Sequence, residues 1–338
     1  MFWVVQSNLY REDGHARLLS ALDRLGSRYV EVQVLPFTDE LFAPEERCTV
    51  WNLADRRRVQ LPYEALSEPV FVMGSYKLVR ILSGPGSAMQ PGAFLDNLEY
   101  PQWAAGWGHE NLLNPSAWVG PLSEAEVARP SFVRPTADTK AFAGHVFHEP
   151  GAFEGWRAAS VAEGTGHVPP DTEVLVAPEV RGGIHYEVRT WVVDGQVVTA
   201  SLYRRGGRLC YSDQVDPEAV RFAQACVDRW QPSPVFVLDV ARTDAGMKVV
   251  EANCLSAAGF YAGDMQKLVS AVEDHFAGRR PGTLDLSKGV HMEIGTGVMN
   301  VSSITHLELW HDPLGTVVQE SEPVVLQRLR PPGAGEGS

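Results

Sequence analysis

Cysteine is scarce in this 338-residue chain, and long apolar runs are missing. The four cysteines, Cys48, Cys210, Cys226 and Cys254, are widely spaced and form no Cys-x-x-Cys pair, which argues against a zinc site and a disulfide framework. We expect them to be small buried hydrophobic residues. No segment approaches the roughly 18 apolar residues of a membrane-spanning helix, and the start of the chain lacks a basic segment followed by a cleavable apolar stretch. These absences predict a cytoplasmic protein without a membrane partner.

Positive charge is also in short supply. The chain has 29 basic and 42 acidic residues, which leaves a formal net charge of −13. The surface as a whole therefore repels duplex nucleic acid and anionic membranes. We expect no bulk binding of nucleic acid, and any polyanion must bind in a local basic pocket.

Several common catalytic and nucleotide-binding motifs are absent from the sequence. It has no G-x-x-x-x-G-K-[ST] phosphate loop, no H-E-x-x-H helix and no G-x-S-x-G elbow. The nearest approach to a dinucleotide-binding motif, Gly295-Thr296-Gly297, ends in Asn300. These absences exclude several classes of enzyme.

The hydrophobic pattern of the first third predicts an α/β arrangement. A strand over 2–5, a helix over 17–25 and a strand over 29–35 follow one another in the order β-α-β. A further strand over 69–73 leads through a Gly-Ser turn into a helix over 76–82. The first part of the chain therefore resembles a small parallel sheet with helices.

Beyond residue 115 the pattern changes to mostly antiparallel strands. Strands are expected over 131–134, 173–180, 185–193, 196–203, 235–241 and 247–252, with a helix over 218–230. A β-rich tail is expected to add strands over 290–299, 305–310 and 316–329. We therefore predict an α+β protein with an N-terminal α/β domain over 1–115, a second domain over 116–282, a β-rich C-terminal extension over 283–330 and a frayed tail over 331–338.

Three tryptophans lie around the first predicted domain boundary. Trp103, Trp107 and Trp118 are expected to pack the seam between the two domains, and an aromatic-lined substrate pocket there is the alternative.

A hairpin in the second domain carries a charged pair. Asp194-Gly195 fits a two-residue type I′ turn, and pairing Val193 with Gln196 places Arg189 opposite Ala200 and Glu187 opposite Leu202. Glu187 and Arg189 share one face, so the carboxylate could orient the guanidinium. The alternative is a structural salt bridge on an exposed sheet.

A later hairpin brings three oxygen-bearing side chains together. Asp244-Ala245-Gly246 fits a three-residue loop with glycine in the left-handed position, and pairing Thr243 with Met247 sets the register. Asp239 then lies opposite Glu251. Asn253 shares the face of Glu251, because side chains alternate along a strand.

Two facing carboxylates in such apolar strands predict a cation between them. Carboxylates directly opposite each other repel and are costly to bury. The oxygen atoms of Asp239, Glu251 and Asn253 suit Mg²⁺, which uses one or two carboxylates together with water and substrate phosphates. The alternatives are a solvated hairpin face and a register that slips by one residue.

With these residues the chain resembles the ATP-grasp superfamily, in which a late strand carries Asp or Glu and the next strand ends in Glu-x-Asn, as Asp239 and Glu251-Ala252-Asn253 do here. Further segments resemble other parts of that fold: Ser131–Pro135 with 140–144, Val174–Val180, Glu187–Arg189, Gly74-Ser75 and Leu112–Asn114. Their order is similar to that of a phage- and bacteria-associated subgroup characterised by one arginine and two lysines. The likeness covers about residues 70–265 and implies that the second domain is an ATP-grasp nucleotide-binding domain.

The resemblance also implies roles for individual residues. Arg134, Lys140 and Arg189 would contact phosphates and act in catalysis, while Pro178, Glu179 and Val180 would meet adenine through the inter-lobe linker. Asp239, Glu251 and Asn253 would hold Mg²⁺, and Glu187 and Lys77 would complete the nucleotide site. Only five lysines occur in the chain, and Lys77 and Lys140 are two of them. A solvent-facing helix position is the ordinary explanation for Lys77.

The activity implied is an ATP- and Mg²⁺-dependent ligation of a carboxylate to an amine, on an amino acid or a peptide, through an acyl phosphate. Two alternatives stay open: a kinase of the same fold that phosphorylates a small molecule or a nucleic-acid end, and a non-catalytic ATP-binding assembly protein. The expected partners are small-molecule or peptide substrates, and a homo-oligomer is compatible with the sequence. The C-terminal extension could serve oligomerisation, cover the substrate or form a small added domain.

Overall fold

The computed structural model describes part of the chain and divides it into two compact units, Met1–Glu273 and Asp274–Ser338. The described residues are 1–8, 14–35, 38–44, 57–61, 69–82, 98–137, 141–161, 168–180, 182–278, 290–294 and 297–301. The domain boundaries expected from the sequence stay predictions.

The first unit begins with the predicted β-α-β arrangement. Strands β1 (Phe2–Gln6), β2 (Arg28–Val34), β3 (Leu41–Phe42) and β4 (Val70–Met73) form a sheet in the order β3-β2-β1-β4. β1 pairs in parallel with both β2 and β4. All residues of β1 and β4 are buried, as expected for parallel strands that are covered on both faces.

Two helices belong to this sheet. Helix α1 (Gly14–Leu25) buries Leu18, Ala21 and Leu22, which lie on one stripe at helical spacing. Helix α3 (Tyr76–Leu82) follows β4, and the hydroxyl of Ser75 accepts a hydrogen bond from the Leu78 amide (3.3 Å). This bond satisfies one of the amide groups that the first turn of a helix leaves unpaired.

A second sheet contains two strands that the sequence pattern did not reveal. Strands β5 (Trp118–Pro121), β6 (Ser131–Pro135), β7 (His145–Phe147) and β8 (Glu173–Pro178) are antiparallel in the order β5-β8-β6-β7. Helices α4 (Tyr100–Trp107) and α5 (Pro150–Val161) precede and follow β5–β7 along the chain. The strands β5 and β7 have three or four residues each, which is too short for alternation to be recognised.

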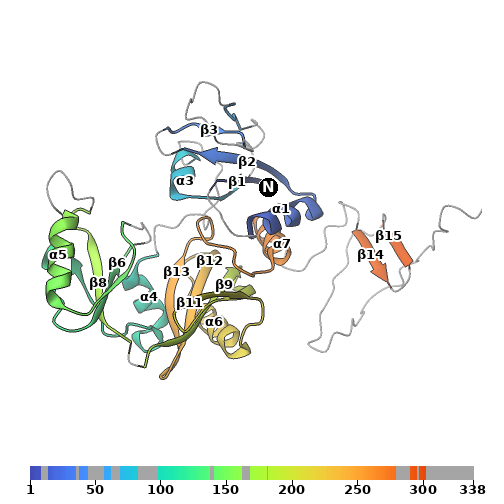
Figure 1. Ribbon diagram of the computed structural model, residues 1–338. Helices are drawn as coiled ribbons and strands as arrows, with labels where there is room; N and C mark the ends of the chain where they lie inside the picture. Colours follow the sequence, from blue (N-terminus) through green and yellow to red (C-terminus); the bar gives the residue numbers. More distant parts are fainter. Residues whose placement is uncertain are drawn as a thin grey trace, which may run out of the picture. The chain divides into compact units, whose positions relative to one another are not determined.

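The third sheet holds the two predicted hairpins (Figure 1). Strands β9 (Ile184–Val193), β10 (Gln196–Arg205), β11 (Arg208–Ser212), β12 (Val235–Thr243) and β13 (Gly246–Asn253) are arranged in the order β11-β10-β9-β12-β13. Helix α6 (Pro217–Arg229) packs on this sheet through Ala219, Ala223, Cys226 and Val227. Asp216 caps α6 by accepting a hydrogen bond from the Glu218 amide (2.9 Å). Helix α7 (Met265–Phe276) comes after β13.

The first hairpin turn is as predicted, but the register beyond it is not. Asp194 and Gly195 both have positive φ (49° and 77°), as a type I′ turn requires. Two register shifts between β9 and β10 then pair Arg189 with Ser201 and Glu187 with Arg204, instead of Ala200 and Leu202. Counting from a turn fails here because each β-bulge adds a residue to one strand.

The second hairpin reaches the predicted carboxylate pair by a different route. Thr243 pairs with Gly246 rather than Met247, so the loop has two residues, and Gly246 has the expected positive φ (95°). A register shift between Val240 and Asp239 then restores the pairing of Asp239 with Glu251. The predicted pair is therefore confirmed, although the predicted turn length was wrong.

Two predictions about burial were wrong for one residue each. Cys226 and Cys254 are buried as expected, but Cys210 is exposed on β11, and Cys48 lies outside the described residues. Trp103 and Trp107 are buried, whereas Trp118 is 41% exposed on β5. Each exception lies on a strand at the edge of its sheet, where only one neighbouring strand covers it.

The second unit contains a hairpin within the predicted β-rich tail. β14 (Val290–Ile294) pairs with β15 (Gly297–Val301), so the single strand expected over 290–299 is two strands. The strands expected over 305–310 and 316–329 lie outside the described residues.

Candidate functional site

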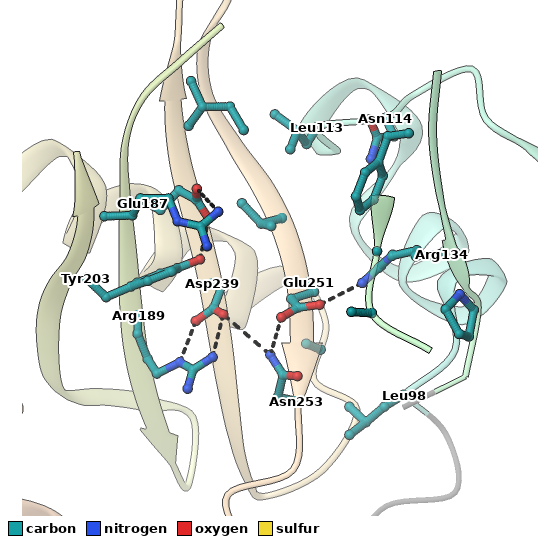
Figure 2. A pocket seen from close by; sticks show the side chains of 18 of the residues that line it. Leu98, Leu113, Asn114, Arg134, Glu187, Arg189, Tyr203, Asp239, Glu251 and Asn253 are labelled. Carbon is teal, nitrogen blue, oxygen red and sulfur yellow. Dashed lines mark hydrogen bonds and ion pairs between the residues drawn. The ribbon is translucent and has the colours of Figure 1, made fainter. Parts of the chain in front are cut away.

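A cavity of about 780 Å³ lies within the first unit. Its walls come from β6, β9, β10, β12 and β13, from the chain between β8 and β9, and from the loop that follows β13. The volume is typical of a site for a small organic ligand or cofactor. Figure 2 shows the charged side chains that point into it.

The centre of the cavity is a buried bidentate ion pair between neighbouring strands. Arg189 Nε donates to Asp239 Oδ1 (2.9 Å), and Arg189 Nη2 donates to Asp239 Oδ2 (2.8 Å). Asp239 is 1% exposed and pairs directly with Arg189 in the ladder between β12 and β9. Cross-strand pairing therefore fixes both partners, and the planar guanidinium matches the carboxylate in geometry.

Glu251, opposite Asp239, is held by a second arginine from another sheet. Arg134 Nη1 on β6 donates to Glu251 Oε2 (2.6 Å). The Arg134 guanidinium also lies over the ring of Trp103, 4.7 Å from its centroid, which adds a cation–π contact. The sequence predicted a cation between the two carboxylates, and in this structure each carboxylate has its own arginine.

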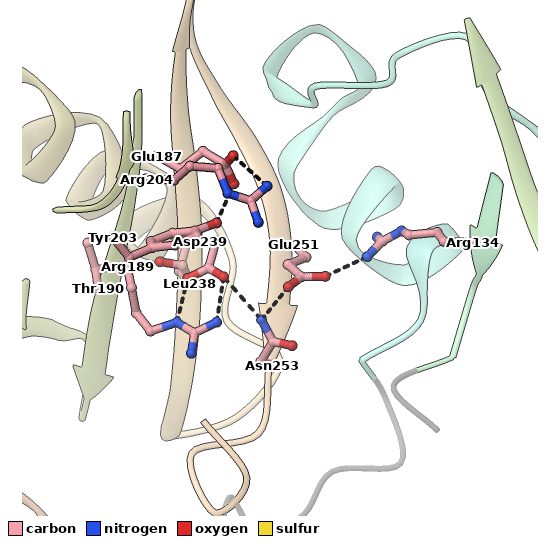
Figure 3. A network of polar contacts seen from close by, with 10 residues as sticks. All are labelled: Arg134, Glu187, Arg189, Thr190, Tyr203, Arg204, Leu238, Asp239, Glu251 and Asn253. Carbon is pink, nitrogen blue, oxygen red and sulfur yellow. Dashed lines mark hydrogen bonds and ion pairs between the residues drawn. The ribbon is translucent and has the colours of Figure 1, made fainter. Parts of the chain in front are cut away.

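Asn253 joins these two ion pairs into one network (Figure 3). Its Nδ2 lies 3.0 Å from Glu251 Oε1 and 3.5 Å from Asp239 Oδ2. The chain of contacts runs from Arg189 through Asp239, Asn253 and Glu251 to Arg134. It links residues that are far apart in the sequence, on strands of two sheets.

Burial sets the electrostatics of this network. Burial raises the pKa of Asp239 and outweighs the opposing effect of Arg189, while Glu251 adds to the increase. The Arg189 guanidinium is also buried, yet its pKa is raised because the attraction of Asp239 exceeds the effect of burial. We conclude that Arg189 stays charged, and that the Asp239 carboxylate depends on it for compensation.

Glu187 does not orient Arg189, contrary to one of the sequence-based interpretations. Its carboxylate accepts a hydrogen bond from the hydroxyl of Tyr203 and another from Arg204 Nη1 (3.3 Å). Burial, followed by the charges of Asp239 and Glu187, raises the pKa of Tyr203 well above its usual range. Tyr203 is therefore a neutral hydrogen-bond donor at physiological pH.

Two tyrosine rings cover Arg189. The guanidinium carbon lies 4.8 Å from the ring centroid of Tyr261 and 5.6 Å from that of Tyr203. The two rings are stacked, with centroids 5.1 Å apart. Neither tyrosine was identified from the sequence. The alternation along β10 could have placed Tyr203 on the face of Ser201, but Tyr261 lies in a loop with no motif.

The remaining predicted nucleotide-site residues are brought to the cavity only in part. Pro178, Glu179 and Val180 line it, as do Leu113 and Asn114. Lys140 lies outside the described residues, although the neighbouring residues 142–144 line the cavity.

Lys77 is not placed on the cavity with the others. Its Nζ lies 3.7 Å from Asp39 Oδ1, and the adjacent Tyr76 lines the cavity instead. The helical turn points successive side chains in different directions, so neighbours in sequence need not share a site.

The oxygen atoms present fit a hard divalent cation. Asp239 and Glu251 offer carboxylates from adjacent strands, and rotation of the Asn253 amide would turn its Oδ1 toward them. Such a ligand set suits Mg²⁺. Within the described ranges no group of three His, Cys, Asp or Glu residues could hold a metal ion, so a site here depends on the asparagine or on a ligand for its further oxygens.

No helix in the described part of the chain is long and apolar enough to cross a membrane.

Comparisons with known proteins identify the fold. The model of an ATP-grasp domain family, clade family 3, matches residues 83–272. No curated protein matches the chain. The solved structures that resemble it include the VanG D-Ala:D-Ser ligase from Enterococcus faecalis, with 14% identity, a TM-score of 0.52, and coverage of 82% of this chain and 98% of that one.

Two further solved structures give the same result. The phosphoribosylamine–glycine ligase from Thermotoga maritima is 11% identical with a TM-score of 0.54, covering 83% of this chain and 76% of that one. A RimK domain ATP-grasp protein from Sphaerobacter thermophilus is 14% identical with a TM-score of 0.50, covering 79% and 98%. At such identities the likeness shows the fold alone. The predicted α+β ATP-grasp fold is confirmed.

Proposed function

Because this chain belongs to the ATP-grasp domain family whose model it matches, we propose that it is an ATP- and Mg²⁺-dependent ligase that joins a carboxylate to an amine. The observation that carries the proposal is the network of Arg189, Asp239, Asn253, Glu251 and Arg134 along one wall of the cavity. It offers both oxygen ligands for a cation and guanidinium groups for phosphates in one place. Ligases among the proteins of similar fold are consistent with this activity.

The arginines can exchange carboxylates for phosphates. The bonds to Asp239 use Nε and Nη2 of Arg189, and among the described residues Nη1 has no hydrogen-bond partner. Arg134 likewise bonds Glu251 through Nη1, while its buried Nε has no partner in the described part of the chain. Both guanidiniums thus have donors for an anionic ligand, and phosphate oxygens are well matched to them.

The proposed nucleotide position follows from the cavity walls. Pro178, Glu179 and Val180 would offer backbone groups to adenine at one side, and Arg134 and Arg189 would hold the phosphates at the other. Lys140 would add a cation. Asp239, Glu251 and Asn253 would hold Mg²⁺, which when bound supplies positive charge to the phosphoryl group that is transferred.

The proposed reaction has two steps. A carboxylate oxygen of the substrate attacks the γ-phosphorus of ATP, the bond to the β-phosphate oxygen breaks, and ADP leaves. The amine nitrogen then attacks the acyl carbon, phosphate departs with the electron pair of the broken C–O bond, and the nitrogen loses a proton. The residues of this chain bind and align the reactants and exclude water, which are the main contributions a protein makes to phosphoryl transfer.

Product analysis tests this function. ADP release should require both a carboxylate and an amine, and it should fail in Asp239→Asn and Glu251→Gln. Asp244→Asn is the matched control, because this exposed carboxylate lies on the same hairpin and bonds His185. A stable phosphorylated acceptor without amide formation would instead show a kinase. ATP binding without any turnover, and unchanged in the two variants, would show a non-catalytic protein.

Metal binding gives a test that is independent of turnover. Arg189 and Arg134 already neutralise Asp239 and Glu251, so the protein without nucleotide should bind Mn²⁺ only weakly, as measured by electron paramagnetic resonance. Adding a non-hydrolysable ATP analogue should increase Mn²⁺ binding, and Glu251→Gln should remove that increase. Equal Mn²⁺ binding in the wild type and in Glu251→Gln would contradict the assigned ligand set.

A further inference from the structure

The outermost strand of the largest sheet exposes apolar side chains. Among the described strands β11 lies at one end of the order β11-β10-β9-β12-β13. Leu209 is 66% and Tyr211 47% exposed, and together they are two of the four large hydrophobic side chains exposed in the described ranges. They are two residues apart, so they lie on the same face of the strand.

This apolar face is continuous with the cavity. The ring of Tyr211 stacks on that of Tyr261, with centroids 4.9 Å apart and planes 22° apart. Tyr261 stacks in turn on Tyr203, and both of these line the cavity. A track of three tyrosines therefore leads from the outermost strand to Arg189, which lies under Tyr261.

The backbone holds Tyr261 in an unusual conformation. Its φ is +44°, a region that costs a residue other than glycine roughly 1–2 kcal/mol. The loop is fixed on both sides of the ring, because Ser201 Oγ accepts from the Ala262 amide (3.0 Å) and Thr199 Oγ1 accepts from the Asp264 amide (2.9 Å). Strain of this kind persists where surrounding contacts enforce it, and it occurs often at ligand sites.

Positive charge gathers at the same end of the sheet. Arg204, Arg205 and Arg208 surround the turn between β10 and β11, in a chain with a net charge of −13. Arg204 lines the cavity, and Arg208 is exposed at the beginning of β11. An acidic partner would be attracted to this edge and repelled by much of the remaining surface.

We propose that β11 and the track of Tyr211, Tyr261 and Tyr203 are the docking surface for an extended acidic peptide that carries aromatic or aliphatic side chains at alternate positions. The peptide adds to β11 as a further strand, its apolar side chains contact Leu209 and Tyr211, and its reacting end enters the cavity. Strand addition supplies affinity through the backbone and selects side chains at every second position. The identity of this peptide as substrate rests on the proposed function, whereas its docking does not.

A second copy of this chain fits the same edge less well. Pairing two β11 strands would bring the arginines of both copies together, and like charges across strands are unfavourable. Charged residues on an edge strand also discourage such pairing. The charge therefore favours a partner of opposite sign.

Peptide binding measured by fluorescence anisotropy tests the proposal. The probes are a panel of fluorescein-labelled six-residue peptides that alternate glutamate with phenylalanine or leucine, and a matched panel with lysine in place of glutamate. Tyr211→Ala and Arg208→Glu are the test variants. The controls are Trp118→Ala, an exposed apolar residue on another sheet edge, and Arg221→Glu, an exposed arginine on α6.

We expect the glutamate panel to bind the wild type and both controls, and to bind each test variant at least about tenfold more weakly. N-methylation of alternate peptide amides should abolish binding, because it removes donors needed for a strand. Equal binding to all variants, preference for the lysine panel, or no binding of any peptide would overturn the proposal. So would a dimer that dissociates in Tyr211→Ala, since a second copy would then occupy the edge.

The same measurements separate this proposal from the proposed function. A protein that binds the peptides but forms no ADP from ATP with any acceptor would refute the ligase and retain the docking surface. A protein that forms an amide from small molecules while none of the peptides binds would refute the docking surface and retain the ligase.

Discussion

Removal of the Arg189 guanidinium should strongly destabilise the protein, because it leaves a buried carboxylate without its cation. In Arg189→Met, Asp239 loses both of its bonds to arginine, at 2.9 and 2.8 Å. The nearest remaining donor is Asn253 Nδ2 at 3.5 Å, and Glu251 lies opposite with like charge. Breaking a buried ion pair in this way typically costs about 3–5 kcal/mol.

Two further variants define what this magnitude means. Arg189→Met combined with Asp239→Leu removes the stranded charge, so we expect it to recover most of the lost stability. Arg134→Gln should cost only about 1–2 kcal/mol, because Glu251 keeps its contact with Asn253 and its side chain is 25% exposed to solvent. Urea unfolding followed by tryptophan fluorescence provides the free energies of unfolding.

The pH dependence provides a second signature of the same effect. Arg189 opposes the increase that burial causes in the pKa of Asp239, so its loss must raise this pKa further. Between the unfolded and the folded pKa, the native state then binds more protons than the unfolded state. The unfolding free energy of Arg189→Met should therefore rise, relative to wild type, as the pH falls from about 7 to about 5.

Two outcomes would refute this reasoning. A loss below about 1 kcal/mol in Arg189→Met would show that water or another group already compensates Asp239. A double variant as unstable as the single one would show that the packing of the Arg189 side chain, rather than its charge, stabilises the sheet.

Two other predictions concern parts of the structure outside the network. Gly106→Ala should destabilise the protein although it lies in a helix, because the new Cβ would approach the Trp230 ring to 2.2 Å, whereas Gly155→Ala, with open space around it, should stabilise helix α5 by about 0.5–1 kcal/mol; thermal unfolding distinguishes the two, and equal shifts would contradict the contact. Burial and the hydrogen bond to Asp216 (2.7 Å) raise the pKa of Tyr186 to about 12, so the ultraviolet difference spectrum against Tyr186→Phe should show ionisation near that pH. The stability this shift contributes is present below about pH 10 and is lost as the pH rises toward that value; ionisation near pH 10 would contradict it.

Local sequence patterns predicted much of the fold because the strands and helices near the site are long and regular. β9, β10 and β12 have nine or ten residues, enough for alternation and turn residues to be recognised. Short strands such as β7, with three residues, carry too little pattern, and contacts with neighbouring strands define them. The glycines at the two hairpin turns have positive φ as expected, since this preference is a property of the residue.

The facing carboxylates were predicted correctly only because two effects compensated. The loop before β13 is one residue shorter than expected, and the bulge at Val250 restores the register at Glu251. A bulge depends on how both strands pack, so a single strand's sequence does not reveal it. The same limit explains why the partners of Arg189 and Glu187 on β10 were misassigned.

The sequence by itself determined which chemical groups are present: a Glu-x-Asn strand end, an apolar strand with one aspartate, and arginines on the strands nearby. Side-chain chemistry and strand alternation are local, so these could be read directly. Only the tertiary structure decided which groups meet, because Arg134 reaches Glu251 across 117 positions of sequence and Tyr261 reaches Arg189 from a loop. Such meetings depend on how separate sheets pack, which no local pattern encodes.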